Sequence, residues 1–220
     1  MTIPVPSPNA AQSRIYRAAL RLFAETGGVE ISVSELAQAA GVARGTIYNN
    51  LKHPENLFGD VASALSHEMI GRVDLVISGL NDPAERLATG IRLFVRRAHE
   101  DHDWARFLVS FAANHQALRD MMREPPARDI ALAIELGRFK VDRAKMMPLV
   151  SMLSGSTLAA MNSVIMGDQA WRDAGADTAE LFLRAGGLSA AEARRVSRCE
   201  LPSLPSAQRT TARQTKRGKP

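Results

Sequence analysis

The 220-residue sequence has few of the features on which several classes of protein depend. Its one cysteine, Cys199, cannot form a disulfide within the chain. No apolar run approaches the roughly 18 residues that a membrane-spanning helix needs. The N-terminal residues "MTIPVPSPNAAQ" lack the basic stretch and apolar core of a signal peptide. We therefore expect a cytoplasmic protein with no membrane partner.

Strand signals are also scarce. Aromatic residues make up only 5% of the chain, and no alternating run of β-branched residues is bounded by turn residues. Apolar residues recur instead at the three- and four-residue spacing of helices. With 45% hydrophobic and 23% charged residues, the composition is ordinary for a soluble globular protein. The sequence therefore predicts an all-α fold.

Acidic residues are absent from the last twenty residues, which carry five positive charges: Arg209, Arg213, Lys216, Arg217 and Lys219. The net charge of the whole chain is +5, so the remainder sums to about zero and the pI of 9.9 reflects the tail. Residues 201–220 contain few large apolar side chains, and we expect them to form a disordered basic tail. We also expect residues 1–12 to be disordered.

Helix start and stop signals divide the rest into a small N-terminal unit at 13–55 and a larger helical body at 56–200. Ser13 is expected to cap the first helix, which ends at Gly27 or Gly28. Ser32 and Glu35 have the spacing of a capping box for the second helix. Later helices are predicted from near Pro54 to about Ser78 and at 83–101, 103–123, 126–140, 145–167, 175–186 and 189–198. The prolines at 125, 126 and 148 are expected to mark helix boundaries.

The stretch "GVARGTIYNNL" predicts the second half of a helix-turn-helix at about residues 32–51. Gly41 allows the sharp turn, and Ile47 and Leu51 face inward on a helix from about Ala43 to Leu51. The side chains left outside can donate to phosphates and base edges: Arg44, Thr46, Tyr48, Asn49 and Asn50. No acid occurs between residues 35 and 55, so the surface meets a polyanion without repulsion. The alternative is an ordinary helical hairpin with a solvated polar face.

These residues resemble the N-terminal domain of the TetR family of bacterial transcriptional regulators. The resemblance covers about residues 13–60 and includes the stretches "RIYRAALRLFAETG", "LAQAAGV" and "GTIYNNL". The resemblance implies a homodimer whose first three helices bind a double-stranded DNA operator and whose remaining helices form a ligand-responsive, dimerising body. It implies that Tyr48 contacts a phosphate and that Arg44, Thr46, Asn49 and Asn50 lie at or near the DNA. The family usually has a lysine where Pro54 stands, and Lys52 is the expected substitute.

A pocket for a small-molecule effector is expected in the body. Trp104, Phe107, Phe111 and His115 recur at helical spacing, and methionines, which pack flexibly, fall on neighbouring helices. From spacing alone, the alternative is plain core. Given the resemblance, we expect a pocket formed by Trp104, Phe107, Phe111, Asn114, His115, Met152 and Asn162. The small residues of "SMLSGSTLAAMNSV" let helices approach closely, and one interpretation is tight packing inside one chain. The resemblance favours a dimer interface with the helix at 175–186 in a four-helix arrangement.

Signals for catalysis are missing. His99 and His102 have an acceptable metal-ligand spacing on a helix, but the favoured interpretation is a solvated helix junction with Asp103 as a cap. No Gly-rich phosphate loop or nucleophile elbow occurs, so we expect no enzyme activity, no cofactor and no metal. We expect a sequence-specific, ligand-responsive dimeric repressor. The alternative is a helical interaction module or an enzyme whose helix-turn-helix is vestigial.

Overall fold

The computed structural model describes residues 10–27, 30–51 and 56–205, and every regular element in those ranges is helical. This confirms the predicted all-α fold. The helices are α1 (Ala10–Thr26), α2 (Val33–Ala40), α3 (Arg44–Asn50), α4 (Leu57–Ile77), α5 (Pro83–Glu100), α6 (His102–Phe111), α7 (Gln116–Glu135), α8 (Met146–Met166), α9 (Trp171–Ala185) and α10 (Ala190–Ser197), with a 3-10 turn, η2 (Arg143–Lys145), before α8.

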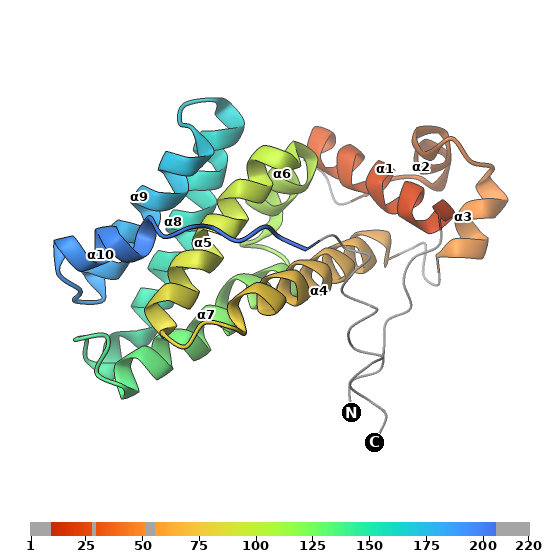
Figure 1. Cartoon of the computed structure of the whole chain (residues 1–220). Coiled ribbons are helices and arrows are strands. Elements are labelled where there is room, and N and C mark those ends of the chain that lie inside the picture. The colour runs from red at the N-terminus through yellow and green to blue at the C-terminus, as the bar shows by residue number, and fades with distance from the viewer. Residues whose placement is uncertain (1–9, 28–29, 52–55, 206–220) are drawn as a thin grey trace, which may run out of the picture.

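The helices form two groups that α4 connects (Figure 1). The first group is α1–α3, at one end of the molecule, where α1 packs against both α2 and α3. The second is a body of α5–α10, in which α5 is central and packs against α7, α8, α9 and α10. Because α1 also packs against α4 and α6, the first group contacts the rest of the molecule directly as well as through the chain connection.

An aromatic cluster joins the two groups. Phe58 of α4 lies edge-on to Phe23 of α1, with ring centroids 4.9 Å apart, and edge-on to Phe111 of α6 at the same separation. Phe107 of α6 lies 5.2 Å from Phe58 and is fully buried. Such rings contribute large buried areas and favourable edge-to-face contacts. The junction between the N-terminal helices and the body is therefore a continuous hydrophobic core.

The helix at 103–123 and the break at 125–126 were both predicted wrongly. The chain leaves the helical path after Phe111, and α7 then runs through Pro125 and Pro126 to Glu135. Pro126 has no N–H for the carbonyl of Met122. The hydroxyl of Ser154, from α8, lies 2.8 Å from that carbonyl oxygen and donates to it. A distant side chain thus satisfies the group that the proline leaves free, and the helix continues.

The first and last described segments are more ordered than expected. Helix α1 begins at Ala10, so Ser13 lies inside the helix instead of capping it. Residues 201–205 run along the body, where Leu201 and Leu204 pack against the core and Arg72 Nε donates to the Pro205 carbonyl at 2.7 Å. The disorder predicted from residue 201 is therefore wrong for these five residues. Residues 1–9 and 206–220 lie outside the described part of the chain.

Helix α8 is the most apolar element. The stretch Arg143–Met166 is long and apolar enough to cross a membrane by length and composition, yet 44% of its most apolar window is buried inside the protein. It packs against α5, α6, α7 and α9, as a core helix does. Its exposed residues include Met147, Met152 and Met166, so one apolar face of α8 is left uncovered by the described residues.

Candidate DNA-binding surface and effector cavity

The start of α2 is fixed by a complete capping box, as predicted. The Ser32 hydroxyl accepts from the Glu35 N–H at 3.2 Å, and a Glu35 carboxylate oxygen accepts from the Ser32 N–H at 2.9 Å. The hydrogen bond with the Ser32 side chain, and to a smaller extent the one with its backbone, lowers the pKa of Glu35. These bonds hold the Glu35 carboxylate against the start of its own helix and favour its ionised form.

The turn between α2 and α3 has the conformation that Gly41 was expected to provide. Its φ is +63°, in the left-handed region that side chains disfavour. The N–H of Gly41 donates to Gln38 at 3.2 Å, and that of Val42 donates to Ala37 at 3.0 Å, so the last carbonyls of α2 are satisfied. Ala43 is extended, and α3 begins at the next residue.

Helix α3 is anchored on one side and open on the other. Ile47 is fully buried and Leu51 is 5% exposed, while Tyr48 is 56% exposed. Arg44 and Asn49 are exposed as well. Within the described residues, Arg44 forms no ion pair. The motif therefore presents a guanidinium, an amide and a phenol to solvent on a short helix whose orientation is fixed by its core contacts.

Two of the predicted DNA-contacting side chains are less available. Thr46 and Asn50 are half-buried, and the Asn50 amide nitrogen donates to the Thr46 carbonyl at 2.8 Å. The Asn50 carbonyl in turn accepts from the Gln12 amide of α1 at 3.3 Å. These contacts tie the end of α3 to α1. Arg44 and Asn49 are thus better placed than Asn50 to reach bases, and Lys52 lies outside the described residues.

Two basic side chains near the motif were missed by the sequence analysis. Arg14 and Arg17, three residues apart on α1, are exposed and lie next to the positions that bury Ile15 and Ala18. Their spacing places them on one side of the helix. The three-residue spacing of the two arginines is visible in the sequence, but the sequence patterns were interpreted only for the apolar face of this helix.

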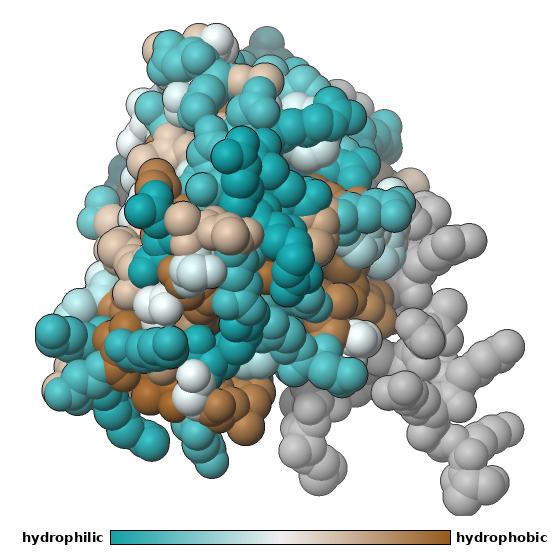
Figure 2. Space-filling model, turned by 60° about the vertical axis from the view of Figure 1, so that its left-hand side comes forward, coloured by the Kyte–Doolittle hydropathy of each residue, from teal (hydrophilic) through white to brown (hydrophobic). Residues whose placement is uncertain are grey.

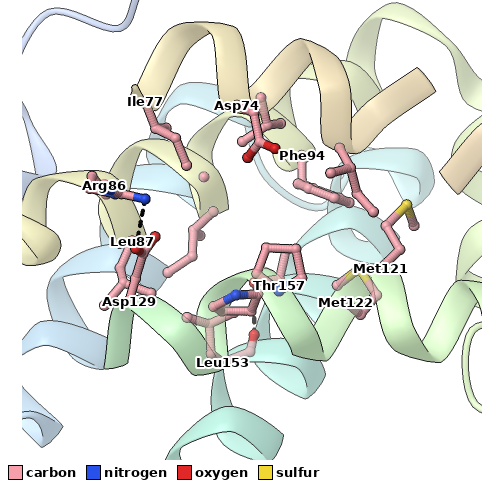
Figure 3. A pocket seen from close by; sticks show the side chains of 16 residues that line it. Asp74, Ile77, Arg86, Leu87, Phe94, Met121, Met122, Asp129, Leu153 and Thr157 are labelled. Carbon is pink, nitrogen blue, oxygen red and sulfur yellow. Dashed lines mark hydrogen bonds and ion pairs between the residues drawn. The ribbon is translucent and has the colours of Figure 1, made fainter. Parts of the chain in front are cut away.

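A cavity lies in the body among α4, α5, α7 and α8 (Figure 3). It holds about 560 Å³ of atom-free space, part of it open to solvent. Most of the lining is apolar: Ile70, Val73, Ile77, Leu87, Ile91, Phe94, Met121, Met122 and Leu153.

The polar side chains of the cavity are two acids, an arginine and Thr157, whose hydroxyl donates to a carbonyl of its own helix at 2.7 Å. Arg86 of α5 pairs with Asp129 of α7 at 2.9 Å, while Asp74 reaches into the cavity from α4 (Figure 3). The Asp74 carboxylate has no hydrogen bond or ion pair among the described groups, and the residue is exposed to solvent. Burial of its carboxyl raises the pKa of Asp74, against the opposing charges of Arg128 and Arg86. Burial likewise raises the pKa of Asp129, although Arg86 opposes the shift. The carboxyl of Asp74 is thus a free acceptor at the edge of an apolar space.

The seven residues predicted to form an effector pocket do not line this cavity. Trp104 and Phe107 are buried in the core. Phe111, Asn114 and His115 line a separate hollow against the N-terminal helices. Met152 and Asn162 are exposed on α8. Helical spacing located the buried side of α6, but the position of the cavity depends on how four helices pack.

The outer face of α8 and α9 carries apolar and small side chains. Met152, Met166 and Leu181 are 40%, 68% and 64% exposed, and Gly155 and Ala159 lie exposed between the two methionines along α8. Figure 2, turned toward this end of the body, shows patches of hydrophobic surface among hydrophilic side chains. Exposed apolar surface of this kind marks protein interfaces.

The two histidines considered as metal ligands belong to different elements. His99 is in α5 and stacks 6.2 Å from Trp171, whereas His102 is the first residue of α6. The cap of α6 is Asp101, which accepts from the Trp104 N–H at 3.1 Å, so the expectation that Asp103 caps it was wrong. Within the described ranges, no group of three or more His, Cys, Asp or Glu side chains could hold a metal ion.

Comparison with known families identifies this architecture. Residues 15–52 match the family model described as "Bacterial regulatory proteins, tetR family", and residues 82–199 match the model "Tetracyclin repressor-like, C-terminal domain". The chain belongs to the TetR family. This TetR-family protein is therefore a transcriptional regulator with an N-terminal helix-turn-helix domain and a C-terminal helical domain, as the sequence resemblance implied.

Relatives agree with this assignment. The HTH-type transcriptional regulator AcrR of Shigella flexneri is 41% identical over 64 residues, which are 29% of each chain, so this match spans less than a third of that regulator. RolR, whose crystal structure in complex with resorcinol is known, is 30% identical to this chain in sequence. The two structures match with a TM-score of 0.65 over 89% of this chain and 96% of RolR. The fatty acid degradation regulator FadR of Bacillus halodurans shares the fold, with 20% identity, a TM-score of 0.66 and coverage of 81% and 97%.

Proposed function

We propose that this TetR-family protein is a dimeric repressor that acts in the cytoplasm and is released from its operator by a small effector. The observation that carries the DNA-binding role is the open face of α3, where Arg44, Tyr48 and Asn49 are exposed on a helix anchored by the buried Ile47. Arginine can bind guanine and asparagine can bind adenine through paired hydrogen bonds. Tyr48, together with Arg14 and Arg17 of α1, would contact phosphates.

A homodimer is supported by the unpartnered face of α8 and α9. Gly155 and Ala159 allow a second helix to approach closely, and Met152, Met166 and Leu181 supply apolar area. Pairing this face with its copy gives a four-helix arrangement. In a two-fold dimer the two α3 helices would reach successive major grooves, roughly 34–36 Å apart, on a near-palindromic operator.

The effector we propose is a small hydroxylated aromatic compound in the cavity among α4, α5, α7 and α8. RolR, whose crystal structure contains resorcinol, supports this class because the two chains are 30% identical over most of their length. The cavity supports it independently. Its apolar walls suit one ring, and the carboxyls of Asp74 and Asp129 can accept from phenolic hydroxyls.

The effector would act through α4. The second half of this helix supplies Val73, Asp74 and Ile77 to the cavity, and Phe58 near its start packs on Phe23 of the first DNA-binding helix. A ligand that binds better when α4 is displaced shifts the population toward that arrangement. The two α3 helices of the dimer would then lose the groove spacing.

The DNA-binding role is tested with duplexes from the region flanking the gene, measured by fluorescence anisotropy. Asn49→Ala should weaken operator binding by about 1–3 kcal/mol and relax the preference at one base position. The matched control is Asn81→Ala, which removes an exposed asparagine from the loop between α4 and α5. Equal affinities for wild type and Asn49→Ala on every sequence would reject α3 as the reading helix.

The effector class is tested by thermal shift and by release of the operator duplex. Resorcinol and phenol serve as hydroxylated probes, and benzene serves as a ring without hydroxyls. Asp74→Asn should weaken the response to the phenols but not to benzene, whereas Asp168→Asn, an exposed acid outside the cavity, should change neither. If no phenol stabilises the protein while operator binding is normal, the effector class is wrong and the DNA-binding role stands.

A further inference from the structure

Four arginines line a groove on the body that takes no part in the proposed DNA or effector binding. Arg92 and Arg96 come from α5, Arg172 comes from the start of α9, and Arg198 follows α10. The groove also contains Trp171 and the single cysteine, Cys199. The groove holds about 1040 Å³ of space between atoms, part of it open to solvent.

The charges of the groove are only partly balanced. Arg96 pairs with Glu100 at 2.7 Å, and Arg198 pairs with Asp177 at 2.8 Å. In contrast, neither Arg92 nor Arg172 has a carboxylate within 4.0 Å in the described part of the chain. Two acids, Asp173 and Glu200, line the groove but form no ion pair there. The guanidiniums of Arg92 and Arg172 are therefore not engaged in direct ion pairs with the described acids, although Asp173 and Glu200 line the same groove.

Of these two arginines, Arg92 is the one whose charge costs more free energy to bury. It is half-buried, and burial followed by repulsion from Arg198 lowers its pKa. A charge that is taken from water without a partner costs free energy, and a bound anion would recover that cost. The empty groove is thus poised to gain from an anion.

Trp171 orients the groove arginines. The guanidinium of Arg172 lies 4.4 Å from the indole centroid and that of Arg96 lies 5.6 Å from it. A guanidinium stacked on an aromatic face keeps its N–H groups in its own plane, where they remain free to bind oxygen atoms. Stacking also restricts the rotamers of these long side chains, so less entropy is lost when an anion binds.

We propose that this groove binds a small oxyanion with two or more negative charges, at a site separate from the effector cavity. Guanidiniums bind carboxylates and phosphates in the same paired geometry, so the shared chemistry is a planar or tetrahedral group of anionic oxygens. The bound anion would bridge α5, α9 and the segment after α10. This site does not depend on the proposed effector and holds whether or not a phenol binds.

Cys199 makes the test direct, because the only thiol in the chain lines the groove. The full-length protein is alkylated with iodoacetate, an anion, and with iodoacetamide, which is neutral. Both reagents attack the same thiolate, so the ratio of their rates reports the local charge rather than the reactivity of the sulfur. A unit charge on the order of 7 Å away in water changes that ratio about threefold.

Arg92→Gln and Arg172→Gln should each lower the iodoacetate-to-iodoacetamide ratio about threefold. Arg106→Gln, an exposed arginine of α6 outside the groove, is the matched control and should leave the ratio unchanged. Citrate and inorganic phosphate are then added at constant ionic strength, set with sodium chloride. Saturable protection of Cys199 from iodoacetamide, weakened about tenfold or more in Arg92→Gln but not in Arg106→Gln, is the expected result.

The two anions distinguish the source of the ligand. Protection by citrate alone indicates a polycarboxylate, protection by phosphate alone indicates a phosphate group, and protection by both indicates recognition by charge. If neither anion protects more than chloride does, or if Cys199 reacts with neither reagent because the groove is covered in the dimer, the proposal is overturned. Should Arg92→Gln fail to fold, the exposed Arg172→Gln variant decides the matter alone.

Discussion

The ion pair between α4 and α5 yields the sharpest stability prediction. Arg97 is 7% exposed, and Glu68 accepts from it at 2.8 Å and 3.4 Å. Its remaining acidic neighbour, Asp101, is 3.8 Å away, and its Nε has no hydrogen-bond partner among the described residues. The Arg97 guanidinium also lies 4.7 Å from the ring of Trp104. Glu68→Ala would therefore leave a buried cation with one weak partner.

The expected cost follows from this burial. Removing one member of a buried ion pair typically costs 3–5 kcal/mol, because the other charge stays buried and uncompensated. The Glu68 side chain is 28% exposed, so water can enter the space left by its truncation and recover part of that cost. We expect Glu68→Ala to lower the free energy of unfolding by about 2–3 kcal/mol.

Urea denaturation followed by far-ultraviolet circular dichroism measures the effect, with Glu100→Ala as the matched control. Glu100 pairs with Arg96 at the same 2.7 Å that separates Glu68 from Arg72, but its side chain is 44% exposed, so its loss should cost less than about 1 kcal/mol. An Arg97→Ala and Glu68→Ala double variant should cost less than the sum of the two single variants. If Glu68→Ala costs no more than Glu100→Ala, the pair does not hold α4 to α5.

The same pair predicts a pH dependence. Burial alone would raise the pKa of Glu68, but the hydrogen bonds and charges of Arg97 and Arg72 outweigh it, and the pKa lies below its ordinary value of 4.5. A carboxyl whose pKa is lowered by folding adds stability at pH values above 4.5, and that stability is lost as the pH falls through the folded pKa. The difference between wild type and Glu68→Gln should therefore shrink in acid.

Three further changes test other parts of the structure. Tyr48→Phe should weaken binding by a similar factor on all DNA sequences, because it removes the hydroxyl that we propose contacts a phosphate, and anisotropy on operator and random duplexes would reveal any base-specific effect. Ala159→Arg should give monomers in analytical ultracentrifugation, since a charged side chain would block close approach of α8, and a folded dimer would place the interface elsewhere. Ser154→Ala should cost about 1–3 kcal/mol in thermal unfolding by leaving the Met122 carbonyl unsatisfied, and an unchanged melting temperature would contradict that account.

Local signals predicted the DNA-binding motif well. The capping box of Ser32 and Glu35 and the positive φ of Gly41 involve residues at most three or four apart, so the sequence contains all the groups that determine them. The inward faces of Ile47 and Leu51 follow from the helical period for the same reason. The half-burial of Asn50 was not predicted, because Gln12 approaches it from α1, 38 residues away.

Features that depend on several helices were beyond the sequence pattern. The prolines of α7 were expected to break a helix, but the hydroxyl that satisfies the free carbonyl comes from Ser154, 32 residues further along. The cavity was placed around Trp104 and Phe107, whereas those side chains fill the core and the space lies beside Met121 and Met122. Periodicity identifies which face of a helix is buried, but not whether that face meets atoms or empty space.

The contacts that hold α4 in place determine how strongly an effector must favour the displaced state to act as we propose. Glu68 holds the middle of the helix to α5, Arg72 holds it to the segment at Pro205, and Phe58 holds its start to α1. To change the operator-competent fraction from 99% to 1%, a ligand must favour the displaced state by about 5.5 kcal/mol. Part of that free energy would be spent on breaking the Glu68–Arg97 pair. Weakening the pair should therefore lower the effector concentration needed for release and raise the fraction of unbound operator without effector, which links the stability measurement to regulation.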